Sequence, residues 1–286
     1  MKPAAFGYHR ARDTAGAVRL LAEFGEDAKL IAGGQSLVAM MNFRLARPRQ
    51  LIDIGRLPGL KGLRTDAGGL RIGALTTHHD VETATGLGAD FDVLRRAVRW
   101  IGHLPIRTRG TVGGSIAHAD ATAEWCLLAV LLDARIVAVG SGGRREIAAR
   151  DFFQGYYTTA LAYDEVITEV FFPHPAPHAA VTEFAQRQGD FAIVAAAVSL
   201  DLDLDAGGPA GVVGGRVALG GVAPLPVRVP EAEAVLAGGG PGVFERAAEA
   251  AAAAIDPPDE AGVSASYRRD LTRTLVRRAC EEAMTP

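Results

Sequence analysis

Two glycine pairs flanked by polar residues are the features of this sequence best suited to bind an anion. The first pair lies in a run of five residues: Ala32, Gly33, Gly34, Gln35 and Ser36. The second lies in a similar run: Thr111, Val112, Gly113, Gly114 and Ser115. Glycine reaches positive φ angles, so a glycine pair can point consecutive backbone N–H groups at a diphosphate, and the flanking hydroxyl and amide groups add uncharged donors. Either pair taken alone is more often an ordinary tight turn.

Two common nucleotide-binding motifs do not occur at these glycines. A dinucleotide fingerprint requires G-x-G-x-x-G between a strand and a helix, and a phosphate loop requires G-x-x-x-x-G-K-[ST]. Neither spacing is present in the two runs. The sequence therefore argues against a Rossmann fold and against a nucleoside triphosphatase.

The charge balance and the cysteine count exclude several classes of protein. The 286 residues include 30 Lys and Arg against 33 Asp and Glu, a net charge of −3, which predicts neither a nucleic acid nor an anionic membrane as partner. The two cysteines, Cys126 and Cys280, cannot supply the four thiolates of an iron–sulfur cluster. The sequence shows no signal peptide and no apolar run long enough for a membrane span, so we expect a cytoplasmic protein with reduced thiols.

The elements that hold the two glycine runs follow from hydrophobic periodicity. Apolar residues at helical spacing predict a helix over 14–24, capped by Asp13 or Thr14 and ended by Gly25. Further helices are expected at 79–85, 92–101, 122–133, 243–255 and 267–282, and strands at 29–31, 51–54, 70–75, 135–139, 181–188, 193–204 and 216–222. Residues 206–215 are predicted to form a glycine-rich hairpin tip. Strands in short clusters separated by helices favour an α+β fold over a doubly wound sheet.

A proline-rich run marks the expected domain boundary. Pro173, Pro175 and Pro177 each lack the backbone donor that a central strand requires. We therefore predict one domain over 1–175, in two lobes at about 1–55 and 56–175, and a second domain over 176–286.

Four motifs together carry a resemblance to a known family. They are AGGQSL at 32–37, IGALTTH at 72–78, IRTRGTVGGS at 106–115 and AHAD at 117–120. In this order and spacing they resemble the FAD-binding medium subunit of the molybdenum hydroxylases, the family of carbon monoxide dehydrogenase and xanthine dehydrogenase. The resemblance implies a two-lobed FAD-binding domain of the vanillyl-alcohol-oxidase (PCMH) type, followed by a smaller α+β domain with a three-stranded meander and helices. It also implies that FAD lies between the lobes and that the C-terminal domain covers part of the flavin.

The resemblance assigns cofactor contacts residue by residue. It places the backbones of both glycine runs around the FAD diphosphate. The other positions that it assigns to the cofactor site are Lys29 and Ile31 before the first run, the apolar Ile101, Glu124 as acceptor from a ribose hydroxyl, and Asp190 and Phe191 from the C-terminal domain. His118 follows the second run, where a place beside the cofactor and a purely local hydrogen-bonding role are both open. Ile193 stands where the xanthine dehydrogenase branch has a lysine, which argues against NAD as electron acceptor.

The function implied by the resemblance is electron transfer within a larger enzyme. FAD in this chain would accept electrons from two-iron two-sulfur clusters of a small subunit and pass them to an external acceptor. A large subunit would hold the molybdenum cofactor and hydroxylate the substrate, and two heterotrimers would pair. No catalytic residue and no metal site is expected in this chain itself.

Two other classes of function remain open from the sequence. A self-sufficient flavin oxidoreductase on the same domain type would turn over a small molecule without partners. A non-catalytic nucleotide-binding or scaffold subunit would hold an adenine nucleotide, or nothing, in its glycine runs.

Three smaller features have structural interpretations at this stage. The adjacent His78 and His79 are expected to be structural rather than a metal pair, because neighbouring helical residues face different ways. Cys126 is expected to pack as a small apolar side chain. The arginines near the C-terminus are expected to form a solvated helix face, with contact to a partner subunit as the less favoured alternative.

Overall fold

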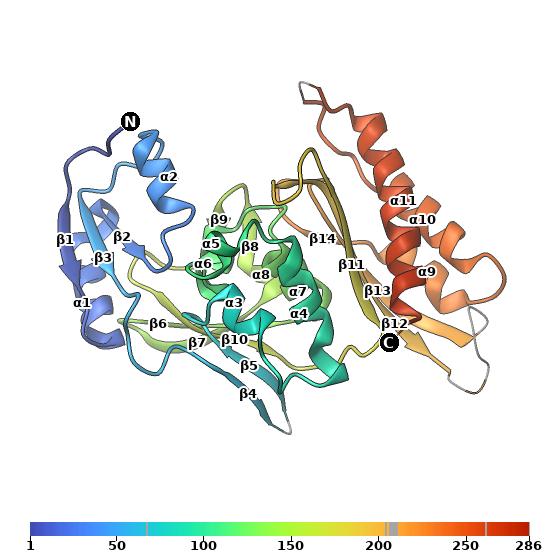
Figure 1. The fold of residues 1–286 in the computed structure, drawn as a ribbon, viewed down its shortest axis with the longest axis horizontal. Helices are drawn as coiled ribbons and strands as arrows, with labels where there is room; N and C mark the ends of the chain where they lie inside the picture. Colours follow the sequence, from blue (N-terminus) through green and yellow to red (C-terminus); the bar gives the residue numbers. More distant parts are fainter. Residues whose placement is uncertain (67, 204, 206–210, 261, 286) are drawn as a thin grey trace.

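The computed structural model describes residues 1–66, 68–203, 205, 211–260 and 262–285, which form three parts in a row along the molecule (Figure 1). The first lobe is a three-stranded parallel sheet in the order β1-β3-β2, with two helices. Its elements are β1 (Gly7–Arg10), α1 (Thr14–Phe24), β2 (Ala28–Ile31), α2 (Leu37–Asn42) and β3 (Gln50–Asp53).

Helix α1 shows why the local sequence prediction succeeds in this lobe. The Asp13 side chain accepts a hydrogen bond from the Gly16 amide, and Gly25 ends the helix with a φ of 57°. The face with Ala17, Val18 and Leu21 is buried. The predicted bounds of 14–24 are confirmed.

The second lobe is built on a five-stranded antiparallel sheet in the order β4-β5-β10-β6-β7. Its strands are β4 (Leu63–Asp66), β5 (Gly69–Gly73), β6 (Arg135–Gly140), β7 (Gly143–Ala148) and β10 (Val166–Phe172), with a small hairpin of β8 (Phe153–Gly155) and β9 (Thr158–Thr159). Its helices are α3 (His78–Glu82), α4 (Asp92–Ala97), α5 (Leu104–Arg107), α6 (Val112–His118), α7 (Glu124–Leu131) and α8 (Ala149–Phe152).

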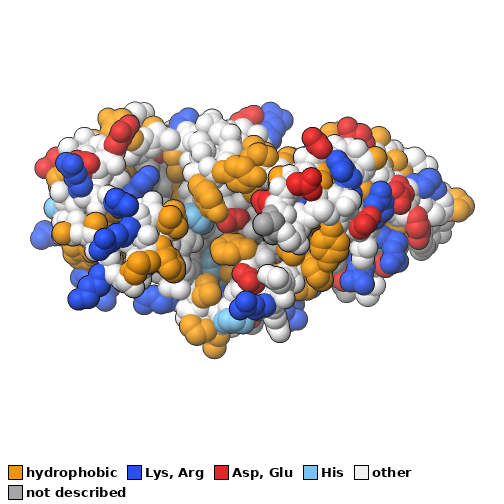
Figure 2. All heavy atoms as spheres, turned by 90° about the horizontal axis from the view of Figure 1, so that it is seen from above, with side chains coloured by type: hydrophobic (Ala, Val, Ile, Leu, Met, Phe, Trp, Pro, Cys, Tyr) orange, Lys and Arg blue, Asp and Glu red, His pale blue; other side chains and the backbone are white. Residues whose placement is uncertain are grey.

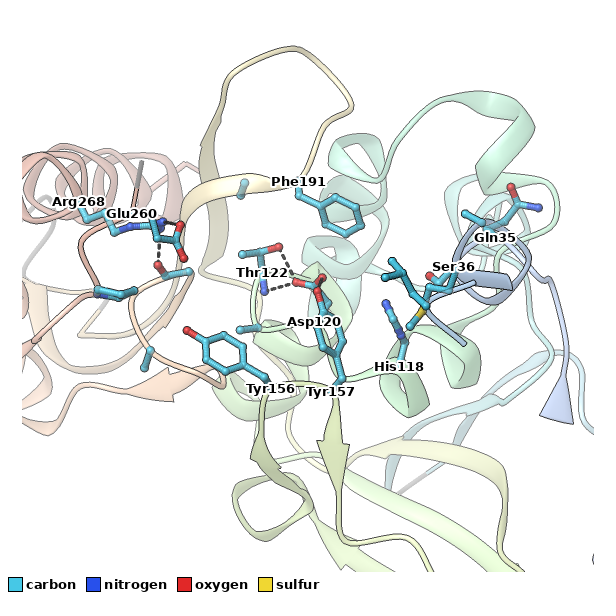
Figure 3. Close-up of a pocket in the computed structure, with 18 residues that line it drawn as sticks. Gln35, Ser36, His118, Asp120, Thr122, Tyr156, Tyr157, Phe191, Glu260 and Arg268 are labelled. Carbon is cyan, nitrogen blue, oxygen red and sulfur yellow. Dashed lines mark hydrogen bonds and ion pairs between the residues drawn. The ribbon is translucent and has the colours of Figure 1, made fainter. Parts of the chain in front are cut away.

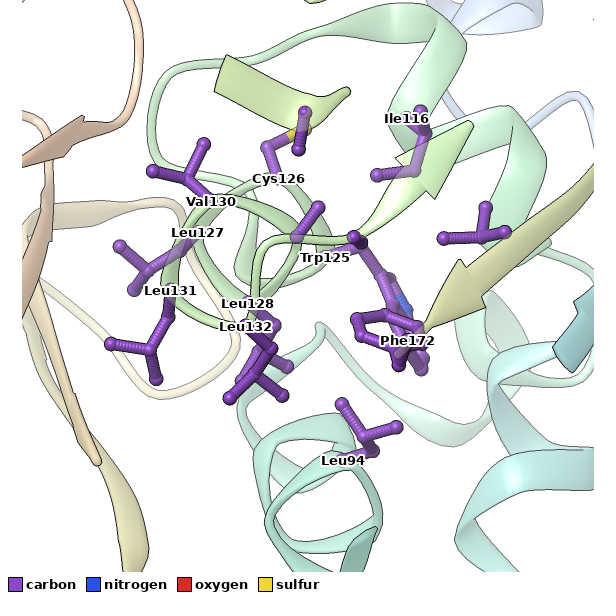
Figure 4. Close-up of a cluster of buried hydrophobic side chains, with 14 of the residues drawn as sticks. Leu94, Ile116, Trp125, Cys126, Leu127, Leu128, Val130, Leu131, Leu132 and Phe172 are labelled. Atoms are coloured by element: carbon purple, nitrogen blue, oxygen red, sulfur yellow. The ribbon is translucent and has the colours of Figure 1, made fainter. Parts of the chain in front are cut away.

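Helix α7 is the centre of the largest hydrophobic core. Every residue from Trp125 to Leu131 is buried, so this helix is apolar on all sides, as expected for a helix surrounded by protein (Figure 4). The same core contains Ala195 and Ala218 of the C-terminal part. The second lobe and the C-terminal part therefore share one continuous core.

The C-terminal part is an antiparallel sheet in the order β11-β12-β13-β14, packed against three helices. Its elements are β11 (Ala179–Ala185), β12 (Ala192–Leu202), β13 (Val212–Gly220), β14 (Val227–Arg228), α9 (Pro230–Gly238), α10 (Val243–Ala254) and α11 (Ala265–Ala283). Residues 173–178, between β10 and β11, are in neither a helix nor a strand. The predicted α+β fold is confirmed.

Three predictions in the C-terminal part need correction. Residues 212–215 are not in a hairpin tip but in β13, where Val212 pairs with Leu202, and residues 206–210 of that predicted tip lie outside the described residues. The meander gains a short fourth strand, β14. Helix α9 was not predicted, although Pro230 followed by Glu231 and Glu233 is a typical helix start.

Candidate cofactor-binding site

A cavity of about 640 Å³ lies between the first lobe, the second lobe and the edge of the C-terminal part. This volume is within the usual range for small-molecule and cofactor sites. Seen from above, hydrophobic side chains gather around the hollow beside the first lobe (Figure 2). The structure brings together in its lining all the predicted site residues except Val112: Lys29, Ile31, Ala32, Gly33, Gly34, Gln35, Ser36, Ile101, Thr111, Gly113, Gly114, Ser115, His118, Glu124, Asp190 and Phe191.

The first glycine run forms a loop between β2 and α2 that offers free backbone donors. Gly34 has a φ of 75°, a conformation that other residues rarely adopt. The backbone N–H groups from Gly33 to Ser36 have no hydrogen-bond acceptor among the described residues. Consecutive unpaired N–H groups at a cavity wall form a cradle for an anion. This loop therefore has the geometry that its sequence predicted.

Gly33 is also required by close packing behind the loop. A Cβ atom on Gly33 would lie 2.1 Å from the carbonyl oxygen of Arg109. Because Arg109 lies two residues before the second glycine run, the two runs are held against each other by backbone contact. Any side chain at position 33 would push them apart.

The second glycine run is not a turn of the same kind, and that prediction was wrong. Gly113 and Gly114 lie in the first turn of α6, whose N-cap Thr111 accepts a hydrogen bond from the Gly114 amide. The amides of Val112, Gly113 and Ser115 donate to the carbonyl oxygens of Thr76, Ala74 and Thr111 respectively. These four N–H groups are therefore already satisfied within the protein, so this run lines the cavity as the start of a helix and not as a loop of free donors.

The glycines of the second run serve close packing instead. A Cβ atom on Gly113 would lie 2.5 Å from the Cβ of Ala74. Val112 is fully buried, which explains why it is the one predicted site residue outside the cavity lining.

Glu124 enters the cavity from the first turn of α7 in an environment that favours its neutral form. Burial, together with the nearby carboxylate of Glu183 on β11, raises its pKa to about 8. Burial also raises the pKa of Glu183 to about 7. At neutral pH the Glu124 carboxyl group is therefore mostly protonated and can both donate and accept a hydrogen bond.

Three polar side chains meet at the outer end of the cavity (Figure 3). The Tyr157 hydroxyl donates to a carboxylate oxygen of Asp120 over 3.3 Å, and its ring lies 4.9 Å from the His118 ring. Burial lowers the pKa of His118, which keeps its imidazole neutral at neutral pH. Tyr157 was not predicted to be a site residue. The only signal in the sequence is that it belongs to a pair of adjacent tyrosines between turn residues.

The loop between β11 and β12 brings Asp190 and Phe191 to the cavity from the C-terminal part. Gly189 has a φ of 79°, and a Cβ there would lie 2.7 Å from the ring of His103 in the second lobe. This close approach sets the position of the loop over the cavity. Phe191 keeps 65% of its surface exposed.

His78 and the two cysteines are part of the packed interior. His78 is buried and accepts a hydrogen bond from the Trp125 indole. Within the described residues, no group of three or more His, Cys, Asp or Glu is arranged to hold a metal. Cys126 and Cys280 are both buried and unpaired, and burial raises the pKa of each thiol. Among the helices of the described residues, none is long and apolar enough to cross a membrane.

Arg268 of α11 departs from the predicted solvated face. Its side chain is buried and donates to the carbonyl oxygens of Ile193 and Gly221 over 2.6 and 2.7 Å. It also pairs with Glu260. The prediction of a solvated side chain was wrong for Arg268. Its long side chain reaches two buried carbonyl oxygens, and the sequence does not reveal that these lie beside it.

Comparisons with known proteins agree with this architecture. The family described as FAD binding domain in molybdopterin dehydrogenase matches residues 4–175, and the CO dehydrogenase flavoprotein C-terminal domain matches residues 179–283. The chain is 39% identical to the 6-hydroxypseudooxynicotine dehydrogenase complex subunit alpha of Paenarthrobacter nicotinovorans, over 99% of this chain and 96% of that protein. It is 34% identical to the carbon monoxide dehydrogenase medium chain of Hydrogenophaga pseudoflava, over 99% and 98% of the two chains.

Solved structures show the same fold. A chain of carbon monoxide dehydrogenase from Hydrogenophaga pseudoflava superposes with a TM-score of 0.92 at 36% identity, covering 99% of this chain and 98% of that one. A chain of quinoline 2-oxidoreductase from Pseudomonas putida 86 also gives a TM-score of 0.92, at 33% identity and with the same coverage.

Proposed function

Because this chain belongs to the family of FAD-binding domains in molybdopterin dehydrogenases, and is a medium-subunit oxidoreductase flavoprotein of that family, we propose how its own residues serve electron transfer. FAD occupies the cavity between the two lobes, with its diphosphate on the loop from Gly33 to Ser36. The observation that carries this proposal is the set of unpaired N–H groups in that loop, inside the region that the FAD-binding family matches.

The residues around the loop suit the rest of a dinucleotide. Lys29, at the cavity wall, adds a positive charge near the diphosphate. The protonated carboxyl group of Glu124 can hydrogen-bond a ribose hydroxyl without adding a negative charge beside the phosphates. Ile101 adds apolar surface, as does Phe191 from the C-terminal part. Bound FAD supplies one-electron and two-electron transfer, and the protein supplies its position and surroundings.

The other redox centres belong to partner subunits in this proposal. Both cysteines are buried singly, so two-iron two-sulfur clusters reside on a small subunit and the molybdenum cofactor on a large subunit. The three subunits form a heterotrimer, and two heterotrimers pair. Substrate hydroxylation then takes place outside this chain, which delivers electrons to an external acceptor.

NAD is a poor candidate for that acceptor. The resemblance places a lysine of the xanthine dehydrogenase branch at the position of Ile193, and the Ile193 side chain packs against the core of the C-terminal part rather than lining the cavity. The cavity therefore receives no cation from this position.

Two organisational proposals accompany the function. We place the boundary between the FAD-binding domain and the C-terminal domain near residue 175, in the segment between β10 and β11. We also propose that the complex works in the cytoplasm, which cell fractionation with an antibody against the chain would test.

Flavin uptake by the purified full chain tests the proposed function. The chain is incubated with FAD, and the bound flavin is measured by equilibrium dialysis and visible absorbance. We expect close to one FAD per chain, no iron, and no turnover of small molecules until partner subunits are added. Failure to bind FAD both alone and in the co-purified complex contradicts the proposal. Turnover by the isolated chain favours a self-sufficient oxidoreductase instead.

A further inference from the structure

One buried side chain of the cofactor cavity has an N–H donor that the described residues leave unused. His78, the first residue of α3, lines the cavity and keeps only 5% of its surface exposed. Its Nδ1 accepts the indole N–H of Trp125, so the ring proton lies on Nε2. Nε2 has no hydrogen-bond partner among the described residues and is not among their buried, unpaired side-chain atoms, so it remains within reach from the cavity. Such an N–H is a donor for a molecule that the cavity holds.

The surrounding structure fixes the orientation of this donor from two directions. The backbone at Thr77 pairs with Thr111, and the His78 amide donates to the carbonyl oxygen of Gly110 over 3.0 Å. On the other side the Trp125 indole holds Nδ1 over 3.0 Å, and the two rings lie nearly parallel, at an angle of 19°. A donor that is already ordered loses little conformational entropy when a ligand binds.

Gly110 links this donor to the loop of free amides. A Cβ atom on Gly110 would lie 2.6 Å from Nε2 of His78, and a Cβ atom on Gly33 would lie 2.9 Å from Cα of Gly110. Nε2 and the loop from Gly33 to Ser36 therefore lie against the same glycine, and all of these residues line the cavity. The imidazole N–H is at the same end of the cavity as the amide cradle.

The donor of His78 supplies what the second glycine run lacks. The amides from Val112 to Ser115 are already bonded within the protein, so that run offers an anion no backbone N–H. His78 is tied to the start of the same run through Gly110. Burial, with the charge of Arg107, lowers the pKa of His78 to about 4, so its ring is an uncharged donor at neutral pH.

We propose that Nε2–H of His78 donates a hydrogen bond to a diphosphate oxygen of bound FAD, and that Trp125 is the positioning residue that fixes the imidazole tautomer for this contact. The diphosphate is then held by the loop amides together with one side-chain donor. A hydrogen bond to an ionised acceptor is stronger than one between neutral groups, so its loss weakens FAD binding measurably. This inference rests on the proposed function, because it assumes FAD with its diphosphate on the loop from Gly33 to Ser36.

FAD affinity of the full chain and of a series of variants tests the inference by equilibrium dialysis. The series is Trp125→Phe, Trp125→Phe with His78→Gln, and Trp125→Phe with His78→Leu. In this background the indole N–H is absent, so a change at His78 leaves no unpaired indole donor, and urea unfolding verifies that each variant is folded. Glutamine keeps an N–H donor and leucine does not. The matched control is His79→Leu, because His79 is the adjacent histidine and does not line the cavity.

A measurement on the unsubstituted chain complements the variants. The chain is labelled with ¹⁵N-histidine, and the Nε2–H resonance of His78 is followed by NMR as FAD, ADP or riboflavin is added. ADP carries the diphosphate without the flavin, and riboflavin carries the flavin without the diphosphate. We expect FAD and ADP to shift this resonance and riboflavin to leave it in place.

We expect Trp125→Phe to weaken FAD binding by about two- to threefold, because the imidazole then divides between two tautomers. Adding His78→Leu should weaken it by a further ten- to hundredfold or about that, adding His78→Gln by clearly less, and His79→Leu should have no effect.

The inference is overturned if the leucine variant binds FAD as tightly as Trp125→Phe, if the glutamine variant is as weak as the leucine variant, or if the control weakens binding equally. It is also overturned, whether or not the variants fold, if FAD leaves the Nε2–H resonance of His78 in place or if riboflavin shifts it and ADP does not. An unsubstituted chain that binds no FAD contradicts the proposed function itself, so the two failures are distinguishable.

Discussion

The indole Nε1 of Trp125 donates a hydrogen bond to Nδ1 of His78 over 3.0 Å, in the interior of the second lobe. Because Nδ1 accepts, the His78 proton resides on Nε2. Burial, together with the positive charge of Arg107, lowers the pKa of His78 to about 4. This neutral histidine ties α3 to α7, the helix at the centre of the largest core.

Removing both partners of this hydrogen bond should cost less than the sum of the two single removals. His78→Leu leaves a buried indole N–H without a partner, so we expect the free energy of unfolding to fall by about 1–3 kcal/mol. Trp125→Phe combined with His78→Leu removes both polar groups, and should show a coupling that offsets part of the two single losses. Urea unfolding of the four proteins in the cycle measures this. Strictly additive losses would show that the hydrogen bond contributes nothing.

Gly33 should be essential for cofactor binding although it has no side chain. In Gly33→Ala the new Cβ would lie 2.1 Å from the Arg109 carbonyl oxygen, so the loop must move away from the second glycine run. We expect at least a tenfold loss of FAD affinity, about 1.4 kcal/mol, measured by equilibrium dialysis. Gly142→Ala is the matched control, because a Cβ there has open space. Equal FAD affinity in the two variants would show that the loop is not the diphosphate site.

The contrast between the two glycine runs shows how far the sequence predicts the site. The first run follows a short strand, and its free amides are a local property that the glycine pair reveals. The second run begins a helix in spite of two glycines, each unfavourable there by about 1 kcal/mol. Contacts distant in sequence, between Gly113 and Ala74, decide that conformation. The sequence shows the two glycines, but it does not show that Ala74 packs against Gly113 and leaves no room for a side chain there.

The same limit applies to Tyr157 and to the buried Arg268. Tyr157 becomes a site residue only because Asp120 and His118 lie beside it in the fold. Arg268 stands in a helix with many charges, and only the tertiary structure shows that its guanidinium reaches two backbone carbonyls. Helix bounds, in contrast, follow from caps and periodicity, which are local.

Arg268 should contribute far more to stability than its exposed neighbours on α11. Arg268→Met removes the donors to the carbonyls of Ile193 and Gly221 and leaves them unpaired in the interior, so we expect a loss of about 2–3 kcal/mol. Arg277→Met breaks an exposed pair with Glu281 one helical turn away and should cost at most about 0.5 kcal/mol. Thermal and urea unfolding measure both. Similar losses would mean that Arg268 acts only as a surface charge.

The carboxyl groups of Glu124 and Glu183, where the second lobe meets the C-terminal part, should make stability fall as the solution becomes more alkaline. The folded pKa values of Glu124 and Glu183, about 8 and about 7, lie above the value of about 4.5 for an unfolded glutamate, so the folded state binds more protons between these limits. The stabilisation is complete below pH 4.5 and is lost as the pH rises through 7 and 8.

Substitution of Glu183 isolates this effect. Glu183→Gln keeps the shape of the protonated acid and cannot ionise, so the decline in the free energy of unfolding between pH 6.5 and 8 should shrink by on the order of 1 kcal/mol. The same change should lower the pKa of Glu124 by removing a neighbouring negative charge. Urea unfolding of the FAD-free chain at intervals across this range measures it, with the exposed Glu23→Gln as control. An unchanged slope in Glu183→Gln would show that the pair does not titrate in this interval.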